Sequence, residues 1–581
     1  FPQAPGTSGT QTYLFSQEAV VPITALRPVN GTGFFTDYGA LNVDSAMLIV
    51  AHSSLMSGAQ AYANYRQNES EVRYNVLLTD VDELYDQFGG GVPKHAGAIR
   101  MFCKFLLDTW STDPRALFLI GKSVNTWPAF GINGLPSVRP NSGNAYANNL
   151  VPTYGYPSSD QCFTTGLNFD GRRMDIPVGR ISAYTDDQVH GYLSKVRAME
   201  QQPIALWQKN ILHFAGGFQQ GQQDQLSQLL NIYAAVAADT SFGGNPILFR
   251  RNSSDVIAQA SADSVRYYIE DPDQGVTLMT FFAHAYAANF DITIDEPENY
   301  DWQGKHPMVI GNSCYIGDFH LNGPSSTSEN WVLQPDVGPI AFMAATEQGI
   351  VPYLFNYTNE YYKSFCQLNY GGSIGEHMKH AGLQSQLNYP TLPSMWNAQT
   401  FALQGDPTLT LNMHTKPDYT VDAAEVFFEP ATVTADVDTF TVKVVIENQG
   451  RAVNRTFNVE LKRTNPGLGP NAISYFETIS NVYLRDTVEF RVPSRGFTGG
   501  AGLNQLQVRV DLEPDLVDEE DNEGNNITTT TLFITSGDLV PVYPYDFAIV
   551  PDPVTELKAS TGDPLAPPRT YLFQIDTTDL F

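Results

Sequence analysis

The sequence predicts an α/β protein with mostly parallel strands, followed by an antiparallel β-sandwich. Up to about residue 413, short apolar runs alternate with segments whose apolar residues recur at helical spacing. Beyond about residue 416 the apolar residues recur with period two. Strands separated by helices form parallel sheets that are covered on both faces, so these patterns predict two kinds of domain in one chain. A length of 581 residues agrees with several folding units.

Composition excludes several classes of protein. Hydrophobic residues make up 42% of the chain and charged residues 16%, which indicates globular domains with large cores. The formal net charge of −29 argues against nucleic acid as the main partner, because that binding depends on clustered cations. The longest apolar stretch, Val276 to Phe290, contains His284 and is shorter than the roughly 18 residues of a membrane-spanning helix. We therefore predict no transmembrane helix.

The α/β region is predicted to contain two adjacent subdomains, at residues 41–180 and 181–413. Residues 1–40 are rich in Gly, Pro and Thr and predict an extended N-terminal segment. Within the first subdomain, apolar runs predict buried strands at 46–50 and 115–121. The other predicted elements are a helix at 98–110, a strand ending within 175–182, a helix at 186–201, a strand at 210–215 and a helix at 223–238.

An immunoglobulin-like β-sandwich is predicted at residues 416–535. Period-two alternation occurs at 433–448, 456–462, 482–492 and 505–512, and a Thr-rich final strand is predicted at 527–534. The acidic stretch at 511–526 fits either a calcium loop or, more commonly, a solvated hairpin. Residues 536–581 are predicted to be a linker and the start of a further C-terminal domain, because the pattern at 569–576 is that of an opening strand.

Two predicted strands end in residues that can do chemistry. The strand at 276–283 is followed by His284, and the strand at 307–313 is followed by Cys314. Thirty residues separate the two, which is enough for one crossover, so both side chains can lie at the C-terminal edge of a parallel sheet. A thiolate is a good nucleophile, and a nearby imidazole can favour that form or protonate a leaving amine. The alternative is a small buried Cys and a His inside the core.

Other familiar signatures are absent from the sequence. Its four cysteines form no CxxC pair, which argues against a zinc site and a disulfide framework. The Gly-rich run at 88–92 opens neither a GxGxxG loop nor a Gly-Lys-Ser phosphate loop, and the sequence contains no HExxH motif. His377 and His380 have helical spacing but no third ligand at a familiar distance, so we predict exposed histidines on a helix face and no metal site.

Several blocks resemble the gingipain-type cysteine peptidases. Residues 281–285 (FFAHA), 296–300 (EPENY) and 311–319 (GNSCYIGDF) are similar to the histidine and cysteine blocks of that family. They are most similar to the branch that contains the type IX secretion sortase PorU and its paralogues. Supporting blocks follow the family order at 80–88, 175–180, 338–342 and 403–409. Together the blocks cover about residues 45 to 413.

The resemblance implies a caspase-like peptidase region and a set of site residues. Cys314 would be the nucleophile and His284 the general acid/base. The backbone N–H groups of Ala285 and Cys314 would form the oxyanion hole. Asn312 and Ser313 would lie beside the substrate side chain that precedes the cleaved bond. No cofactor is required, no metal ligand is assigned, and a structural calcium ion is compatible with the family.

The implied function is a peptidase or transpeptidase at the cell envelope. Its substrates would be proteins or peptides, cleaved at C-terminal sorting signals of type IX-secreted proteins, with secretion or outer-membrane components as partners. We expect an exported protein at the cell surface, in the outer membrane or outside the cell, rather than in the periplasm. A start at Phe1 instead of Met fits a removed signal segment and equally a sequence taken from within a longer chain.

Three departures from the family pattern leave a second function open. Ala283 and Ala285 flank the histidine where relatives carry small Gly or Ser residues. Ala215 precedes the Gly216-Gly217 pair where gingipains have an acid that supports the histidine. The alternative is therefore a weak or inactive peptidase fold that serves as a scaffold or binding subunit. If the protein is instead active, another acid would support the histidine in place of the one missing at Ala215. Asp318 and Glu329 match family positions with either a functional or a structural role.

Overall fold

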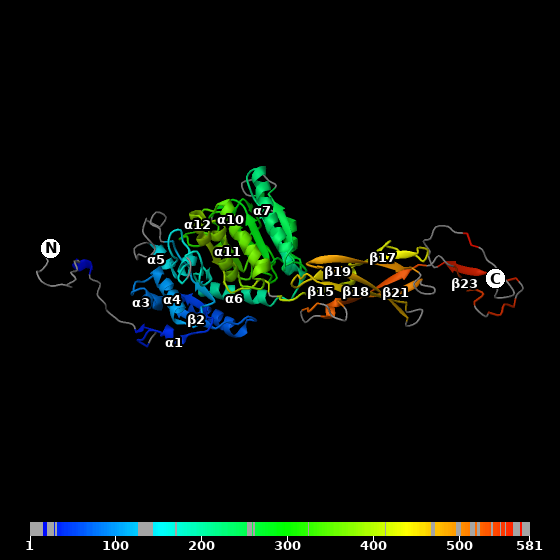
Figure 1. Cartoon of the computed structure of the whole chain (residues 1–581), viewed down its shortest axis with the longest axis horizontal. Coiled ribbons are helices and arrows are strands. Elements are labelled where there is room, and N and C mark those ends of the chain that lie inside the picture. The colour runs from blue at the N-terminus through cyan, green and yellow to red at the C-terminus, as the bar shows by residue number, and fades with distance from the viewer. Residues whose placement is uncertain are drawn as a thin grey trace.

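The structure is a computed structural model that carries side chains (Figure 1). It describes residues 16–19, 28–29, 32–125, 143–168, 171–251, 258–259, 262–286, 288–323, 325–412, 414–465, 471–494, 501–511, 517–519, 523–535, 539–545, 548–551, 554–561 and 570–571.

A ten-stranded sheet forms the centre of the α/β region. Its order is β2 (Val76–Asp80), β1 (Met47–Ala51), β3 (Ala116–Ile120), β4 (Val178–Ile181), β14 (Phe401–Gln404), β13 (Ala341–Ala345), β12 (Met308–Asn312), β8 (Leu278–Phe282), β5 (Asn210–Ala215) and β6 (Asn245–Arg250). Within the sheet, β13 and β14 are antiparallel and the other neighbouring strands are parallel. The predicted fold class, α/β with mostly parallel strands, is thus confirmed.

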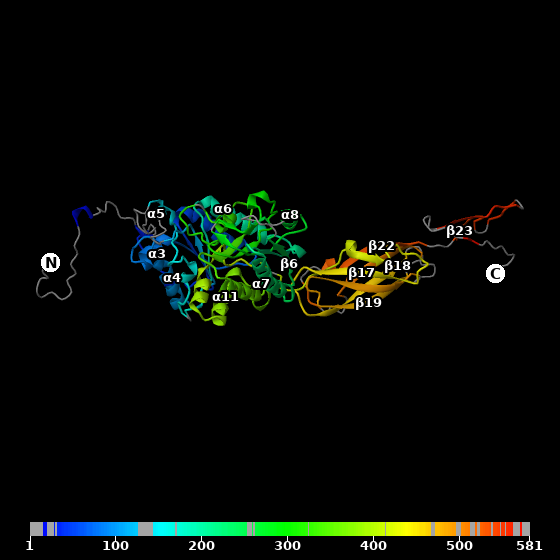
Figure 2. The same cartoon turned by 90° about the horizontal axis from the view of Figure 1, so that it is seen from above.

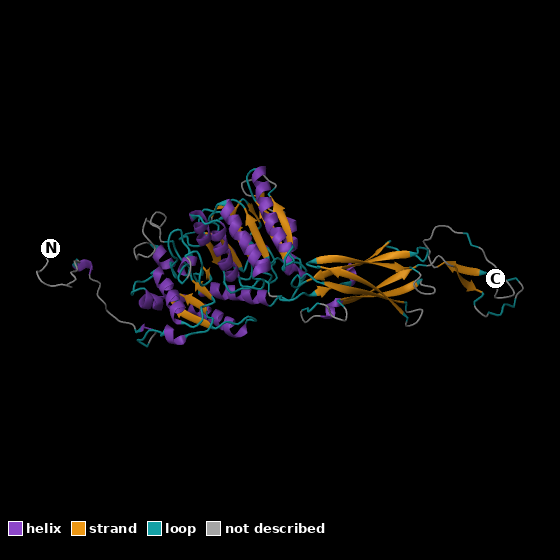
Figure 3. Cartoon of the chain, in the orientation of Figure 1, coloured by secondary structure: helices purple, strands orange, loops and turns teal. Residues whose placement is uncertain are grey.

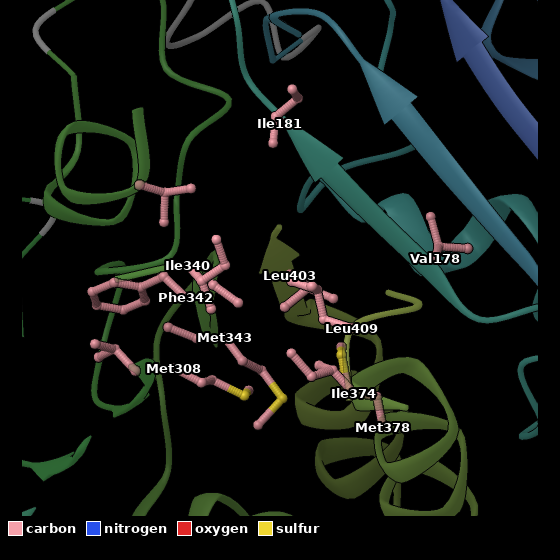
Figure 4. Packing of buried hydrophobic residues seen from close by; sticks show 14 of the residues in the cluster. Val178, Ile181, Met308, Ile340, Phe342, Met343, Ile374, Met378, Leu403 and Leu409 are labelled. Atoms are coloured by element: carbon pink, nitrogen blue, oxygen red, sulfur yellow. The ribbon is translucent and has the colours of Figure 1, made fainter. Parts of the chain in front are cut away.

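The two predicted subdomains share this sheet. Their predicted boundary, between residues 180 and 181, falls inside β4. β4 pairs with β3 along four residues but meets β14 through one register pair, Arg180 with Gln404. Figure 4 shows Val178 and Ile181 of β4 on one side of this seam and Leu403 on the other. All three belong to one continuous hydrophobic core. The halves of the sheet are therefore continuous, with their narrowest connection at β4 and β14.

Helices cover both faces of the sheet (Figure 3). One packed group contains α2 (Met56–Asn64), α6 (Asp186–Glu200) and α9 (Thr327–Leu333). The other contains α7 (Gln220–Ala238), α10 (Val351–Lys363), α11 (Ile374–Asn388) and α12 (Leu392–Thr400). The remaining α-helices are α1 (Tyr38–Leu41), α3 (Val81–Phe88), α4 (Ala96–Thr109), α5 (Asn144–Asn148) and α8 (Ala262–Glu270). Cover on both faces explains why the central strands are continuous apolar runs without alternation.

Two antiparallel sheets follow the α/β region. The first contains β15 (Tyr419–Thr420), β16 (Val426–Glu429), β17 (Thr439–Asn448) and β20 (Arg485–Pro493). The second has the order β19 (Ala472–Ser480), β18 (Thr456–Thr464), β21 (Gly502–Val510) and β22 (Ile527–Ile534). Alternate residues of β17 and β21 are buried, and both sheets contribute to one core. This is the predicted sandwich, while its immunoglobulin-like classification stays a prediction.

The sandwich meets the α/β region at the N-terminal ends of β5 and β6. The Lys209 ammonium, just before β5, donates to the Tyr483 carbonyl at 2.8 Å. The Ala452 N–H donates to the carbonyl of Ser241, just before β6, at 2.9 Å. Figure 2 shows the sandwich extending from this side of the α/β region. The carboxyl ends of the parallel strands, where active sites of such sheets gather, lie at the opposite edge.

The two ends of the chain lie largely outside the described residues. A two-stranded sheet of β23 (Leu539–Tyr543) and β24 (Lys558–Thr561) occurs within the region predicted to be a linker. The strand predicted at 569–576 lies outside the described residues except for residues 570–571, which form no strand. Most of the predicted N-terminal segment at 1–40 also lies outside them, as does much of the acidic stretch at 511–526.

Candidate active site

β8 and β12 are neighbouring parallel strands and end side by side. Phe282 and Asn312, the last residues of the two strands, are register partners. His284 and Cys314 each follow two residues later, so both stand at the C-terminal edge of the sheet. The Ala283 N–H donates to the Asn312 carbonyl at 3.3 Å. The sequence prediction that a single crossover brings these two strands together is confirmed.

A sharp turn presents Cys314 at this edge. The next residue, Tyr315, has a φ of +57°, in the left-handed region that residues other than Gly seldom adopt. Its N–H donates to the Glu347 carbonyl at 3.0 Å, which fixes the turn against the loop after β13. The Cys314 sulfur lies 3.7 Å from the Gly349 carbonyl oxygen and is partly exposed. The turn therefore directs the chain away from the sheet immediately after the thiol.

The other three cysteines are held in the neutral form. Burial raises the pKa of the Cys103 thiol to about 12 and raises the pKa of Cys162 as well. Burial also raises the pKa of Cys366 well above its ordinary value. A neutral thiol is a poor nucleophile, so the raised pKa values argue against these three side chains as the nucleophile.

A short hairpin of β9 (Ala285–Tyr286) and β10 (Asn289–Phe290) follows His284. Its position is set by Phe290, whose ring stacks on Phe281 of β8 with 4.5 Å between centroids. Phe281 in turn stacks on Phe214 of β5 at 4.3 Å. These rings are almost entirely buried. A packed column of aromatic rings thus anchors the segment that carries the histidine.

The hairpin register bears on the predicted oxyanion hole. The Asp291 N–H donates to the His284 carbonyl at 2.8 Å, and the next pair along the hairpin is Ala285 with Phe290. Antiparallel pairs alternate between hydrogen-bonded and non-hydrogen-bonded, so Ala285 and Phe290 form a non-hydrogen-bonded pair. The Ala285 N–H therefore points away from β10. This direction is compatible with the oxyanion role, which stays a prediction for Ala285 and for Cys314.

A buried carboxylate, Asp291, lies beside the histidine segment. It accepts from the Gly217 N–H at 2.8 Å and from the His284 N–H at 3.2 Å, and Arg251 approaches it to 3.3 Å. A Cβ atom at Gly216 would lie 2.1 Å from the same carboxylate. Asp291 thus occupies the space in front of the Gly-Gly pair. It holds the histidine through backbone atoms, whereas Ala215 leaves the expected acid position empty.

The side chains of Asn312 and Ser313 point into the protein. The Asn312 amide oxygen accepts from the Thr358 hydroxyl at 2.6 Å, and the Ser313 hydroxyl donates to the Ala283 carbonyl at 2.6 Å. Both residues are buried. Any contact they make with a substrate beside the cleaved bond therefore has to use their backbone atoms.

A buried group of charges supports the segment that follows Cys314. The Lys122 ammonium lies 2.7 Å from the Glu329 carboxylate and donates to the Phe319 carbonyl at 2.8 Å. Asp318 is buried next to this pair, and burial raises its pKa to about 7. Asp318 and Glu329, the two acids that matched family positions, thus both belong to the packing beneath the cysteine loop.

The prediction of exposed histidines on the later helix is wrong, because His380 is only 21% exposed and His377 is buried. The His377 Nδ1 lies 3.0 Å from the Ser364 hydroxyl because α11 packs this face against α10. Across the described ranges, no group of three or more His, Cys, Asp or Glu side chains is placed to hold a metal ion. The acidic stretch is only partly described, so a structural calcium ion stays a prediction.

Residues 41–412 match the family model described as peptidase family C25. The chain belongs to peptidase family C25. This is the gingipain family of cysteine peptidases, so the predicted family is confirmed, while the closeness to its sortase branch stays a prediction. No curated protein matches the chain. Among the helices of the described ranges, none combines the length and apolar character needed to cross a membrane.

Solved structures of C25-type and other proteases are similar to the chain at low identity. The Arg-specific cysteine proteinase gingipain R (RgpB) has 14% identity and a TM-score of 0.48, over 85% of this chain and 98% of that chain. A complex of the Porphyromonas gingivalis RgpB pro- and mature domains has 14% identity and a TM-score of 0.46, over 84% and 100%. A structure described only as a protease has 11% identity and a TM-score of 0.49, over 85% and 97%.

Proposed function

We propose that this protein cleaves peptide bonds through an acyl-enzyme on Cys314, with His284 as the general acid/base. The observation that carries the proposal is the register of β8 and β12, which brings both residues to the same edge of the sheet. Membership of family C25 supports it. The structure also supports Cys314 over the other cysteines, since burial keeps those thiols neutral.

The reaction divides into two steps. The Cys314 thiol gives its proton to His284 and its sulfur forms a bond to the carbonyl carbon of the substrate. The peptide C–N bond then breaks as His284 passes that proton to the leaving amine. Charge that develops on the carbonyl oxygen is stabilised by the N–H groups of Ala285 and Cys314. In the second step His284 removes a proton from water or from an acceptor amine, which attacks the thioester and releases the thiol.

The proposed substrates are exported proteins that carry a C-terminal sorting signal. The residue blocks around His284 and Cys314 are most similar to the branch with the type IX secretion sortase, which supports this class. The enzyme would act at the cell surface, in the outer membrane or outside the cell, together with secretion or outer-membrane components. An amine acceptor in the second step would make it a transpeptidase, and water would make it a peptidase.

A peptide electrophile that reacts with thiols tests the site. We expect an adduct on Cys314 in the wild-type protein, found by peptide mass spectrometry, and its loss in Cys314→Ala. Cys162→Ala is the matched control, because that partly exposed thiol has its pKa raised by burial. The C-termini of candidate cargo proteins are then compared with wild-type protein and Cys314→Ala. An unlabelled Cys314 together with identical cargo C-termini would refute catalysis and support the scaffold function.

A further inference from the structure

The ring of Phe218 stacks on the imidazole of His284. The two centroids are 4.8 Å apart and the planes differ by 13°. Phe218 lies in the short segment between β5 and α7, next to the Gly216-Gly217 pair, and its side chain is 59% exposed. The stack thus places an aromatic ring directly on the face of the imidazole that is proposed to transfer protons.

We propose that Phe218 is a positioning residue for His284, held by Arg251 and Asp291, in the reaction proposed above. The inference rests on that function, because it assigns His284 the proton transfers. The imidazole is exposed, and its ring has to present a nitrogen toward the thiol of the neighbouring strand end. Stacking on a flat ring limits the rotation of the imidazole about its side-chain bonds. Ala215 supplies no carboxylate for this task.

Arg251 links Phe218 to the backbone of the histidine segment. Its guanidinium carbon lies 5.3 Å from the centroid of the Phe218 ring. The same guanidinium lies 3.3 Å from the Asp291 carboxylate and donates to the Asp291 carbonyl at 2.6 Å. Asp291 accepts from the N–H groups of Gly217 and His284. Ring, guanidinium and carboxylate therefore form one closed set of contacts around the histidine, with Arg251 and Asp291 buried.

The backbone of this segment is held independently of the Phe218 ring. The Phe218 N–H donates to the Gln222 side-chain oxygen at 3.1 Å, and the Gly216 N–H donates to the Phe282 carbonyl at 2.9 Å. A substitution of the ring therefore removes the stack and leaves the loop in place. This separation allows the positioning role to be tested without unfolding the site.

Kinetics of the full chain on a cleaved peptide provide the first test. We expect Phe218→Leu to lower kcat by about 10- to 100-fold with KM little changed, as for a misplaced catalytic group. Phe218→Tyr keeps the flat ring and should restore kcat. Phe427→Leu is the matched control, because Phe427 lies on the sandwich and is 50% exposed. A rise in KM with unchanged kcat would overturn positioning and assign Phe218 to substrate contact instead.

A second measurement does not depend on activity. In protein labelled with ¹³C-histidine, the ring signal of His284 is assigned by its loss in His284→Asn. Stacking shifts ring protons upfield, so Phe218→Leu should move this signal downfield, while Phe218→Tyr and Phe427→Leu should leave it in place. An unchanged signal in Phe218→Leu would overturn the stack. A moved signal in a protein that cleaves nothing would uphold the stack and refute the proposed reaction.

Discussion

The hydroxyl of Ser313 donates a 2.6 Å hydrogen bond to the carbonyl oxygen of Ala283. Ser313 directly precedes Cys314, and Ala283 directly precedes His284. The bond therefore joins the two strand ends directly before the two proposed catalytic residues. The two strand ends are thus held together by the sheet register, by the hydrogen bond from the Ala283 N–H to the Asn312 carbonyl and by this side-chain hydrogen bond.

Ser313→Ala tests that connection. The buried Ala283 carbonyl would lose its side-chain donor, so we expect the free energy of unfolding to fall by about 1–2 kcal/mol. The rate of peptide cleavage should fall as well, because the strand ends gain freedom. Urea unfolding and steady-state kinetics measure the two effects. Ser227→Ala removes a buried hydroxyl that bonds within α7 at 2.7 Å, and it should change stability without changing kcat.

Gly216→Ala tests the space occupied by Asp291. The added Cβ would lie 2.1 Å from the Asp291 carboxylate and 2.8 Å from the Ala283 Cβ, so the histidine segment has to move. We expect kcat to fall by about 10- to 100-fold. Gly221→Ala is the control, since a Cβ there meets nothing within 4 Å. Equal kinetics for the two variants would contradict the close fit around Asp291.

Arg66→Met tests the connection between the halves of the sheet. Arg66 pairs with Asp406 at 2.8 Å and with Glu200 at 2.6 Å, and both Arg66 and Asp406 are buried. Removing the guanidinium leaves a buried charge unpaired, so we expect the free energy of unfolding to fall by about 3–5 kcal/mol. Arg250→Met, which breaks an exposed pair with Asp224, should leave stability nearly unchanged. Denaturant titration distinguishes the two outcomes.

Asp318 predicts a dependence of stability on pH. Burial raises its pKa to about 7, so in the folded protein this carboxyl is neutral in mild acid, whereas it is ionised in the unfolded chain. The folded state then binds more protons, and stability falls by at most about 1.4 kcal/mol per pH unit as pH rises from about 5 to 7. Asp318→Asn should remove this loss. Urea unfolding of both proteins at about pH 5 and pH 8 measures it. The exposed Asp301→Asn should follow the wild type.

The strand ends that carry the candidate site can be predicted from the sequence, because buried parallel strands are continuous apolar runs. The bounds predicted for β5 and β22 agree with the structure residue for residue, and both catalytic candidates lie at the predicted strand ends. Local sequence patterns do not predict where β14 lies in the sheet. It lies between β13 and β4 although it follows both in the chain. Its pairing depends on contacts between distant segments.

The surroundings of His284 were also beyond the sequence patterns. The residue that precedes the Gly-Gly pair in the sequence is Ala215, which supplies no acid. The structure places Asp291 there through the hairpin that follows the histidine, seven residues later in the chain. An acid at the far end of such a hairpin is a signal that can be sought in a sequence. No comparable sequence pattern points to Phe218 as a neighbour of His284.

The narrow connection between β4 and β14 has a consequence for how the enzyme can be controlled. His284 and Cys314 follow strands on the same side of that connection. A tilt of one half of the sheet against the other would move both residues together and leave the distance between them unchanged. A partner that drives such a tilt would change how readily a polypeptide is admitted and leave the bond-breaking step untouched. Its effect would be seen in KM and not in kcat.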